Sequence, residues 1–374
     1  MASLLTELLH DTSRRGEEIA VNLDGLQGKL SAEVEAYRQR MLQMVEQARG
    51  IVELMLADPD LENPAYSTSY FRDYRQVAHL MNILENMPLL VLRRFSKQDQ
   101  SVTSLMASIC QEVGFPYAAP ICSSISSQYY WTMPDMDLIF MPCLEPNHLL
   151  GLADGYHELG HILLFRKKSQ LVHPALAIVD GWYDKTLARG KQLNWPEASL
   201  DEVDNFRHQW RLSWLLEFGA DLIATFLVGP AFGWCNIRTS TNLGGGFFSG
   251  SENHPADDAR ANAIGLMLQR IGYVEACEAI KKRWDDLGAL SKELAPNRYE
   301  FAYPGELLNE LAKFLHTTCV DLGLRQYTDN ASSPAPVTTA INQAWDSFRD
   351  NPDTFGEFEQ SILTKLLDQL DITI

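Results

Sequence analysis

Two histidines four residues apart flank a glutamate in the segment HELGH, which spans residues 157–161. Residues i and i+4 share one face of a helix, so the imidazoles of His157 and His161 can bind one metal ion. The carboxylate of Glu158 would lie beside that ion, where it can take a proton from a water molecule. In hydrolases such a pair of imidazoles is typical of zinc with a third protein ligand and an open position for water. The segment therefore predicts one Zn²⁺ ion per chain.

An HExxH pattern also occurs by chance, in roughly one protein in a hundred. The alternative is a solvated helix face that carries two histidines and no metal. Apolar residues surround the segment, however, and favour partial burial of His157 and Glu158; they are Leu149, Leu150, Leu152, Ala153, Ile162, Leu163 and Leu164. A buried carboxylate beside two imidazoles needs a partner, and a cation between them supplies one.

Two acids stand four residues apart in the otherwise apolar run WLLEFGADLIATFLV, residues 214–228. On a helix, Glu217 and Asp221 would lie on one face. Glu217 suits a third zinc ligand, and Asp221 suits an acceptor for the ring N–H of a ligand histidine, which would fix the tautomer of that histidine. The alternative is an acidic pair that forms a salt bridge with Arg211 or another base.

A third block, residues 252–260, follows a loop rich in serine, threonine and glycine predicted at residues 236–250. His254 precedes a proline that can occupy the first turn of a helix, so its side chain could project into a cleft and steady a water or an oxyanion. Arg260 could pair with an acid near the centre. The alternatives are a surface histidine and a helix-stabilising arginine. Tyr303 is a second candidate oxyanion stabiliser.

The order HELGH, then EFGAD, then HPxxxxR resembles the gluzincin metallopeptidases, and most closely the family that includes the CAAX prenyl endopeptidases and related quality-control metallopeptidases. The resemblance covers roughly residues 138–270. It implies that two histidines and the first acid of ExxxD hold zinc, that the glutamate of HELGH is the base, that the later aspartate supports a histidine ligand, and that the histidine of the HP block lies close to the metal. By motif, these roles belong to His157, His161, Glu217, Glu158, Asp221 and His254.

Together the motifs predict a zinc-dependent endopeptidase in which Glu158 passes a proton from water to the leaving nitrogen. The resemblance implies that substrate is added as a strand along residues 138–141, and the glycines at 244–246 could form a lid. They lack the ending of a phosphate-binding loop. Two alternatives stay open. One is a helical interaction protein with a structural or inactive zinc site, and the other is a zinc hydrolase of a non-peptide amide.

Composition limits the partners. The chain has 374 residues and a formal net charge of −18, which opposes non-specific binding to nucleic acid and to anionic lipid. Six scattered cysteines predict reduced thiols. We expect no secretory signal and no membrane span, and therefore a cytoplasmic protein that acts on a protein or peptide substrate. The oligomeric state stays open.

The hydrophobic pattern predicts a mostly α protein of the α+β class: a helical metallopeptidase domain with a small antiparallel sheet before the active-site helix, and helical regions at both ends. The sheet is expected from strands at 128–132 and 138–141. The predicted domains are residues 1–115, 116–290 and 291–374. A flexible linker or long loop is expected at 328–336. Helices are expected at 31–57, 70–86, 101–113, 147–165, 206–229, 255–271 and up to about residue 370.

Overall fold

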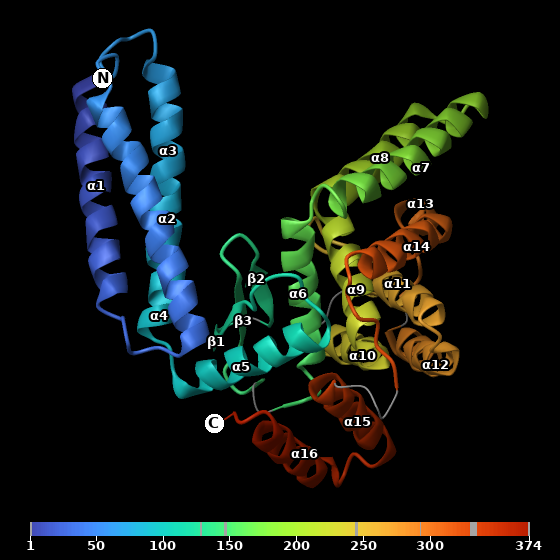
Figure 1. Cartoon of the computed structure of the whole chain (residues 1–374). Coiled ribbons are helices and arrows are strands. Elements are labelled where there is room, and N and C mark those ends of the chain that lie inside the picture. The colour runs from blue at the N-terminus through green and yellow to red at the C-terminus, as the bar shows by residue number, and fades with distance from the viewer. Residues whose placement is uncertain are drawn as a thin grey trace. The chain divides into compact units, whose positions relative to one another are not determined.

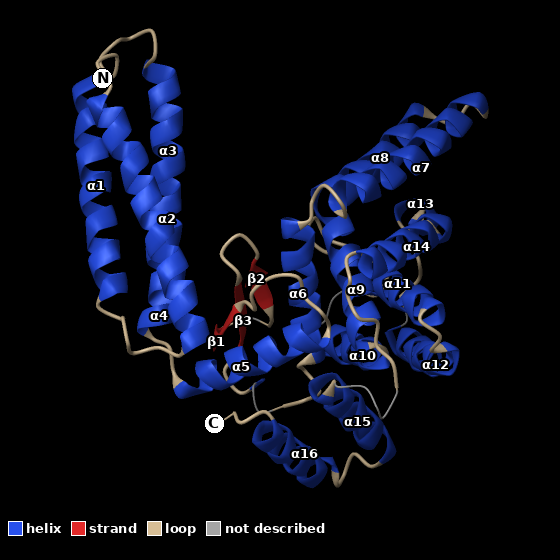
Figure 2. Cartoon of the chain, viewed as in Figure 1, coloured by secondary structure: helices blue, strands red, loops and turns tan. Residues whose placement is uncertain are grey.

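The computed structural model describes residues 2–127, 129–145, 148–243, 246–291, 293–329 and 335–372. They form two compact units, Met1–Gln100 and Ser101–Ile374. Helices dominate both, and a small sheet lies in the second unit (Figure 2), so the predicted α+β class is confirmed. Helix α5 (Lys97–Glu112) spans the division between the units. The domain boundaries predicted after residues 115 and 290 stay predictions.

The first unit is built on three long helices that lie side by side: α1 (Ala2–Asp24), α2 (Ala32–Ala57) and α3 (Ser67–Leu84) (Figure 1). A π-helical turn, η1 (Glu85–Leu89), and the short α4 (Leu90–Arg93) follow. The predicted helix at 31–57 corresponds to α2, which buries apolar residues at Val34, Tyr37, Met41, Val45, Ala48, Val52 and Met55. The helix ends as expected before Asp58, because Pro59 disfavours a helical conformation at the residue that precedes it.

The sheet in the second unit has three strands, β1 (Ile121–Ser126), β2 (Trp131–Met133) and β3 (Leu138–Pro142), in the order β1-β3-β2. β2 and β3 pair antiparallel, as predicted, and the rings of Trp131 and Phe140 stack across them with centroids 4.0 Å apart. β1 pairs with β3 in parallel, so the sheet is mixed and the purely antiparallel prediction is wrong. The sequence ICSSIS hid β1 because its small polar residues carry little strand preference. Residue 128 lies outside the described residues.

β3 is the central strand of this sheet, with β1 on one side and β2 on the other. Its backbone N–H and C=O groups are therefore directed to neighbours on both sides, and a peptide cannot add along it. The expectation that residues 138–141 bind substrate as an edge strand is wrong. β2 has a strand neighbour on one side only, so it is an edge of the described sheet.

The HELGH segment lies in α6 (Ala153–Arg166), and three further helices pack in this part of the unit: α9 (Leu215–Val228), α10 (Pro230–Leu243) and α11 (Asp257–Arg270). α6 packs along α9, and α9 also contacts α10 and α11. Gly229 joins α9 to α10 with φ +68°, a conformation that favours glycine, and Pro230 then begins the next helix. Residues 236–243 thus continue a helix, which corrects the predicted loop. Gly244 and Gly245 of the predicted lid lie outside the described residues.

The helix predicted from residue 206 to 229 is interrupted. It divides into α8 (Glu197–Gln209), a π-helical turn η3 (Trp210–Trp214) and α9. The π-turn buries the indoles of both tryptophans at its ends. π-turns of this kind often occur next to functional sites. η3 lies directly before α9, the helix that contains Glu217.

The remaining helices complete the second unit. They are α7 (Val172–Gln192), α12 (Val274–Ser291), α13 (Tyr299–Ala302), α14 (Gly305–Asp321), α15 (Pro336–Asp350) and α16 (Phe355–Gln369). α14 packs against α11 and α9. Residues 330–334 of the predicted linker lie outside the described residues. None of the described helices is long and apolar enough to cross a membrane. All six cysteines are free thiols, and Cys143 is the exposed one.

Candidate active site

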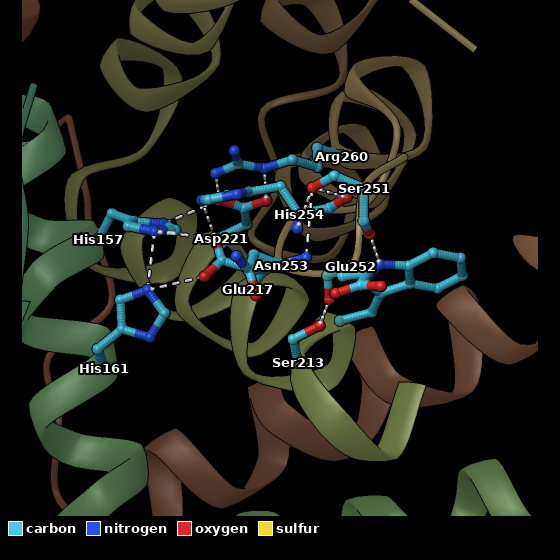
Figure 3. A network of polar contacts seen from close by, with 11 residues as sticks. His157, His161, Ser213, Glu217, Asp221, Ser251, Glu252, Asn253, His254 and Arg260 are labelled. Carbon is cyan, nitrogen blue, oxygen red and sulfur yellow. Dashed lines mark hydrogen bonds and ion pairs between the residues drawn. The ribbon is translucent and has the colours of Figure 1, made fainter. Parts of the chain in front are cut away.

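The side chains of His157, His161 and Glu217 converge between α6 and α9 (Figure 3). The Nε2 atoms of the two histidines are 3.0 Å apart. The carboxylate of Glu217 places Oε2 3.6 Å from Nε2 of His157 and Oε1 3.5 Å from Nε2 of His161. The structure therefore brings together the three residues that the sequence predicted as metal ligands.

These distances fit a tetrahedral zinc ion. Zinc bonds of about 2.0–2.1 Å place neighbouring ligand atoms about 3.3 Å apart, and the three observed separations lie on either side of that value. In the part of the chain that the structure describes, His157, His161 and Glu217 are the one group of three or more potential ligands that could hold a metal ion. Two imidazoles and a carboxylate are also the donor set of a catalytic centre that keeps a position open.

Gly160, the fourth residue of HELGH, allows α6 and α9 to approach closely. A β-carbon added at this position would lie 2.9 Å from the Cα of Ala220 and 3.1 Å from its carbonyl oxygen. Both atoms belong to the backbone of α9, so they cannot move aside as a flexible side chain would. The glycine thus has a packing function that the sequence pattern does not reveal, and it sets the separation across which the ligands meet.

We expect Gly160→Ala to push the two helices apart. Overpacking of this kind costs about 1–3 kcal/mol of unfolding free energy, and the displaced ligands should weaken zinc binding. Urea unfolding and zinc titration would measure the two effects.

Gly181, in the middle of α7, is the matched control, since a β-carbon there would meet nothing within 4 Å. Gly181→Ala should stabilise the protein by about 0.5–1 kcal/mol. If Gly160→Ala and Gly181→Ala changed the free energy of unfolding and zinc binding equally, the close contact between α6 and α9 would not require glycine at position 160.

Asp221 connects His157 to Arg260. Its side chain is fully buried, and its Oδ1 lies 2.9 Å from Nδ1 of His157. Arg260 donates from Nε to Oδ2 at 2.8 Å and from Nη2 to Oδ1 at 2.7 Å. Burial alone would favour the neutral acid, but the guanidinium of Arg260 holds the pKa of Asp221 below its ordinary value. Arg211, the alternative partner for this acidic pair, lies instead 3.6 Å from Asp180.

Glu158 is buried next to the ligands and lines the cavity in front of them. In the metal-free protein, burial raises the pKa of Glu158 to about 8, and the charges of Glu217 and Asp154 add to the effect. Burial opposes the charge on His157, yet the carboxylates of Asp221 and Glu217 outweigh it and raise the pKa of His157 to about 10. Burial and the neighbouring His157 lower the pKa of His161 to about 4. A base with a pKa near the working pH is suited to proton transfer.

A cavity of about 890 Å³ opens onto this centre. Trp131 and Thr132 of β2 form part of its wall, and residues of α10 and α11 form another part. A smaller cavity of about 210 Å³ shares His161 and Pro134 with it, and its other residues are mostly apolar. His161 therefore lines both cavities.

His254 lines the larger cavity, with Nε2 3.9 Å from Oε2 of Glu217 and a side chain that is 62% exposed. Its backbone is held in a turn by Ser251, whose hydroxyl accepts a hydrogen bond from the N–H of His254 at 3.0 Å. The turn is attached to η3, since Trp214 donates to the carbonyl of Ser251 at 2.9 Å and Ser213 donates to the carbonyl of Glu252 (Figure 3). The structure thus places His254 in the cavity wall beside Glu217, and its part in the chemistry stays a prediction.

Tyr303 has a different place. Its hydroxyl accepts a hydrogen bond from the backbone N–H of Ala256 at 3.0 Å, and its ring packs against those of Trp214 and Tyr299. Tyr303 is buried and is not among the residues that line the cavity. It holds the segment that follows His254, and this position does not suit direct stabilisation of an oxyanion.

Several residues of the cavity wall were not predicted from the sequence. Asp154 stands one helical turn before His157, a spacing that could have revealed it as a neighbour. Tyr129, Tyr130 and Asp257 carried no comparable signal, because only the packing of separate segments brings them to the cavity.

Comparison of the chain with protein-family models, with curated proteins and with solved structures gives no match. The resemblance to gluzincins therefore rests on the three motifs HELGH, EFGAD and HPxxxxR. The geometry of the centre provides an independent basis for assigning a function.

Proposed function

We propose that the protein is a zinc-dependent endopeptidase whose centre is formed by His157, His161 and Glu217. The observation that carries the proposal is the convergence of their ligand atoms, at 3.0–3.6 Å, beside the buried carboxylate of Glu158. A scattered set of histidines and acids would not combine tetrahedral spacing with a base and an open cavity.

Zn²⁺, when bound, would supply an activated water and a Lewis acid that polarises the scissile carbonyl. Glu158 would accept a proton from the attacking water and donate it to the leaving nitrogen. Asp221 orients the imidazole of His157 through Nδ1 and leaves Nε2 free to face the ion. His254 can reach a developing oxyanion from the cavity wall, where its exposed side chain has freedom to move.

The position of β2 at the edge of the described sheet favours a peptide as the substrate. Trp131 and Thr132 line the cavity, and the outer edge of β2 has no strand neighbour in the described sheet. An extended peptide can pair with such an edge through main-chain hydrogen bonds, with its side chains alternating between two faces. A non-peptide amide would not need this edge, so the endopeptidase is favoured over that alternative.

A structural or inactive zinc site is the second alternative. It would require a fourth permanent protein ligand. His254 is the nearest candidate, but its side chain is largely exposed and lies in the cavity wall. The arrangement therefore favours an open coordination position.

We expect the purified protein to contain close to one zinc ion per chain, measured by mass spectrometry. Metal-free His157, with a pKa of about 10, carries a proton at neutral pH, and zinc binds only the neutral imidazole. Raising the pH removes this competing proton, so the apparent affinity should rise about tenfold per pH unit from 6 to 8. Competition with a chromophoric chelator would measure the change.

His157→Ala and His161→Ala should each lower the zinc content well below one, whereas His208→Ala, on α8, should not. Zinc content near zero in the wild type, unchanged in the variants, would end the metal proposal.

A further inference from the structure

The smaller cavity beside the proposed centre is continuous with the larger one. It has a volume of about 210 Å³ and shares His161 and Pro134 with the large cavity. Pro134 directly follows the edge strand β2. Because proline has no backbone N–H, pairing along this edge ends there. A peptide paired with β2 therefore comes next to the residues that both cavities share.

The wall of the smaller cavity is mostly apolar and comes from three helices. Its apolar side chains are Leu164 and Phe165 of α6, Val172 and Leu176 of α7, and Leu215 and Leu216 of α9. Phe165, Val172 and Leu176 are only half-buried, and Leu216 is 38% exposed. Covering apolar surface that water still reaches is favourable. An apolar ligand therefore suits this cavity.

Contacts between the helices fix the shape of this wall. Leu164 is buried against α9 at Gly219, where an added β-carbon would lie 3.0 Å from Cδ1 of Leu164. Arg211 of η3 lies 3.6 Å from Asp180 of α7 and connects these two elements. A cavity that is formed before its ligand arrives loses little conformational entropy when it is filled.

The volume of the smaller cavity fits one side chain. A dry apolar cavity of about 150 Å³ holds benzene, so the cavity beside His161 has room for the ring of a phenylalanine or for the side chain of a leucine or methionine. Lys168 and Arg211 complete the wall, and both side chains are exposed. Their positive charges disfavour a lysine or arginine side chain as the occupant.

We propose that this cavity is a specificity pocket that binds the side chain of a phenylalanine, leucine or methionine next to the scissile bond. The pocket rests on the proposed peptidase function. Because His161 lines both cavities, a substrate residue whose side chain enters the smaller one keeps its backbone in the larger one, beside the proposed metal ligands. Val172 and Leu176 of α7, a helix outside the three motifs, then limit the size of the side chain.

The first test uses internally quenched decapeptide libraries, N-acetylated and C-amidated, with phenylalanine, leucine, alanine or lysine at each position in turn. At one position, wild-type protein should cleave the phenylalanine and leucine libraries with a kcat/KM about 10- to 100-fold higher than the alanine library. Lysine should be no better than alanine. Mass spectrometry of the products should place the cut next to that position.

Opposite substitutions at Val172, the first residue of α7, test whether this cavity sets the preference. Val172→Phe fills the cavity and should bring the ratio of phenylalanine to alanine toward one. Val172→Ala enlarges the cavity and should raise the kcat/KM of a tryptophan library relative to the phenylalanine library. Val274, the first residue of α12, is 49% exposed and lies outside the cavity. Val274→Phe and Val274→Ala are the matched controls and should leave both ratios unchanged.

Binding separates this inference from the peptidase proposal. Fluorescence anisotropy on Glu158→Gln, with labelled phenylalanine and alanine libraries, reports the pocket even if nothing is cleaved. A preference for phenylalanine that Val172→Phe abolishes and Val274→Phe retains supports the pocket. Equal affinities, or a preference that survives Val172→Phe, overturn it. Absence of cleavage by wild type with this preference present would contradict the peptidase proposal alone. Circular dichroism must match wild type, and if Val172→Phe does not fold, the shift toward tryptophan in Val172→Ala decides the outcome.

Discussion

Glu158→Gln should keep its zinc and lose hydrolysis. The amide has nearly the shape of the carboxylate but cannot accept a proton from water, so kcat should fall about 10²- to 10⁴-fold. Glutamine also removes the cost of a buried carboxylate, whose pKa is raised to about 8 in the metal-free protein. The variant should therefore be at least as stable as wild type. Peptide cleavage and zinc content, measured on the same preparation, check both expectations.

Glu306→Gln, at an exposed position on α14, is the matched control and should leave both quantities unchanged. Activity retained in Glu158→Gln would show that another group is the base. In cells, comparison of protein termini between wild type and Glu158→Gln would identify the substrates, because only the wild type should generate new termini.

Arg260→Met should destabilise the protein strongly, and more than Gly160→Ala. It removes the guanidinium that donates two hydrogen bonds to Asp221, which is fully buried, and leaves His157, protonated in the metal-free protein, as the cation beside that carboxylate. Removing one member of a buried ion pair costs about 3–5 kcal/mol, and the remaining attraction of His157 places the expected loss toward the lower end of that range. Urea unfolding of the metal-free protein at neutral pH would measure the loss.

The double variant, Asp221→Asn with Arg260→Met, tests the cause. Asparagine carries no charge, so the second substitution should cost much less in the Asp221→Asn background than in the wild type. The coupling free energy between the two positions should be about 0.5–3 kcal/mol. Additive losses would mean that Arg260 stabilises α11 by packing and not by balancing Asp221. Asp221→Asn alone should weaken zinc binding about 10- to 100-fold through His157.

The parts of the centre carried by one helix were predictable. His157 and His161, like Glu217 and Asp221, are four residues apart in apolar surroundings, and helical periodicity alone places each pair on one face. The two pairs come together only because α6 packs against α9. The order of the motifs suggested this packing only through the resemblance to gluzincins. The sequence predicts an acidic partner for Arg260, and the structure identifies that acid as Asp221.

Other features depended on contacts that no local pattern encodes. The segment 236–243 contains Ser, Thr and Asn, so it resembled a loop, yet α10 buries Ala231, Phe232 and Cys235 on one face and continues as a helix. Strand β1 pairs in parallel with a partner beyond β2 in sequence, and only the complete sheet shows that β3 is central. Oδ2 of Asp154 likewise accepts hydrogen bonds from segments far away in the chain.

The close backbone contact between Gly160 and Ala220 has a thermodynamic consequence for metal uptake. We expect this contact to hold α6 and α9 at the same separation with and without an ion, so that the proposed ligand atoms stay close together. Binding would then cost little conformational entropy. A bound ion would add to stability by mass action in a protein that folds without it, unlike small zinc domains, in which metal binding provides the free energy of folding. Exchange of the ion and unfolding of the chain should then be separate events.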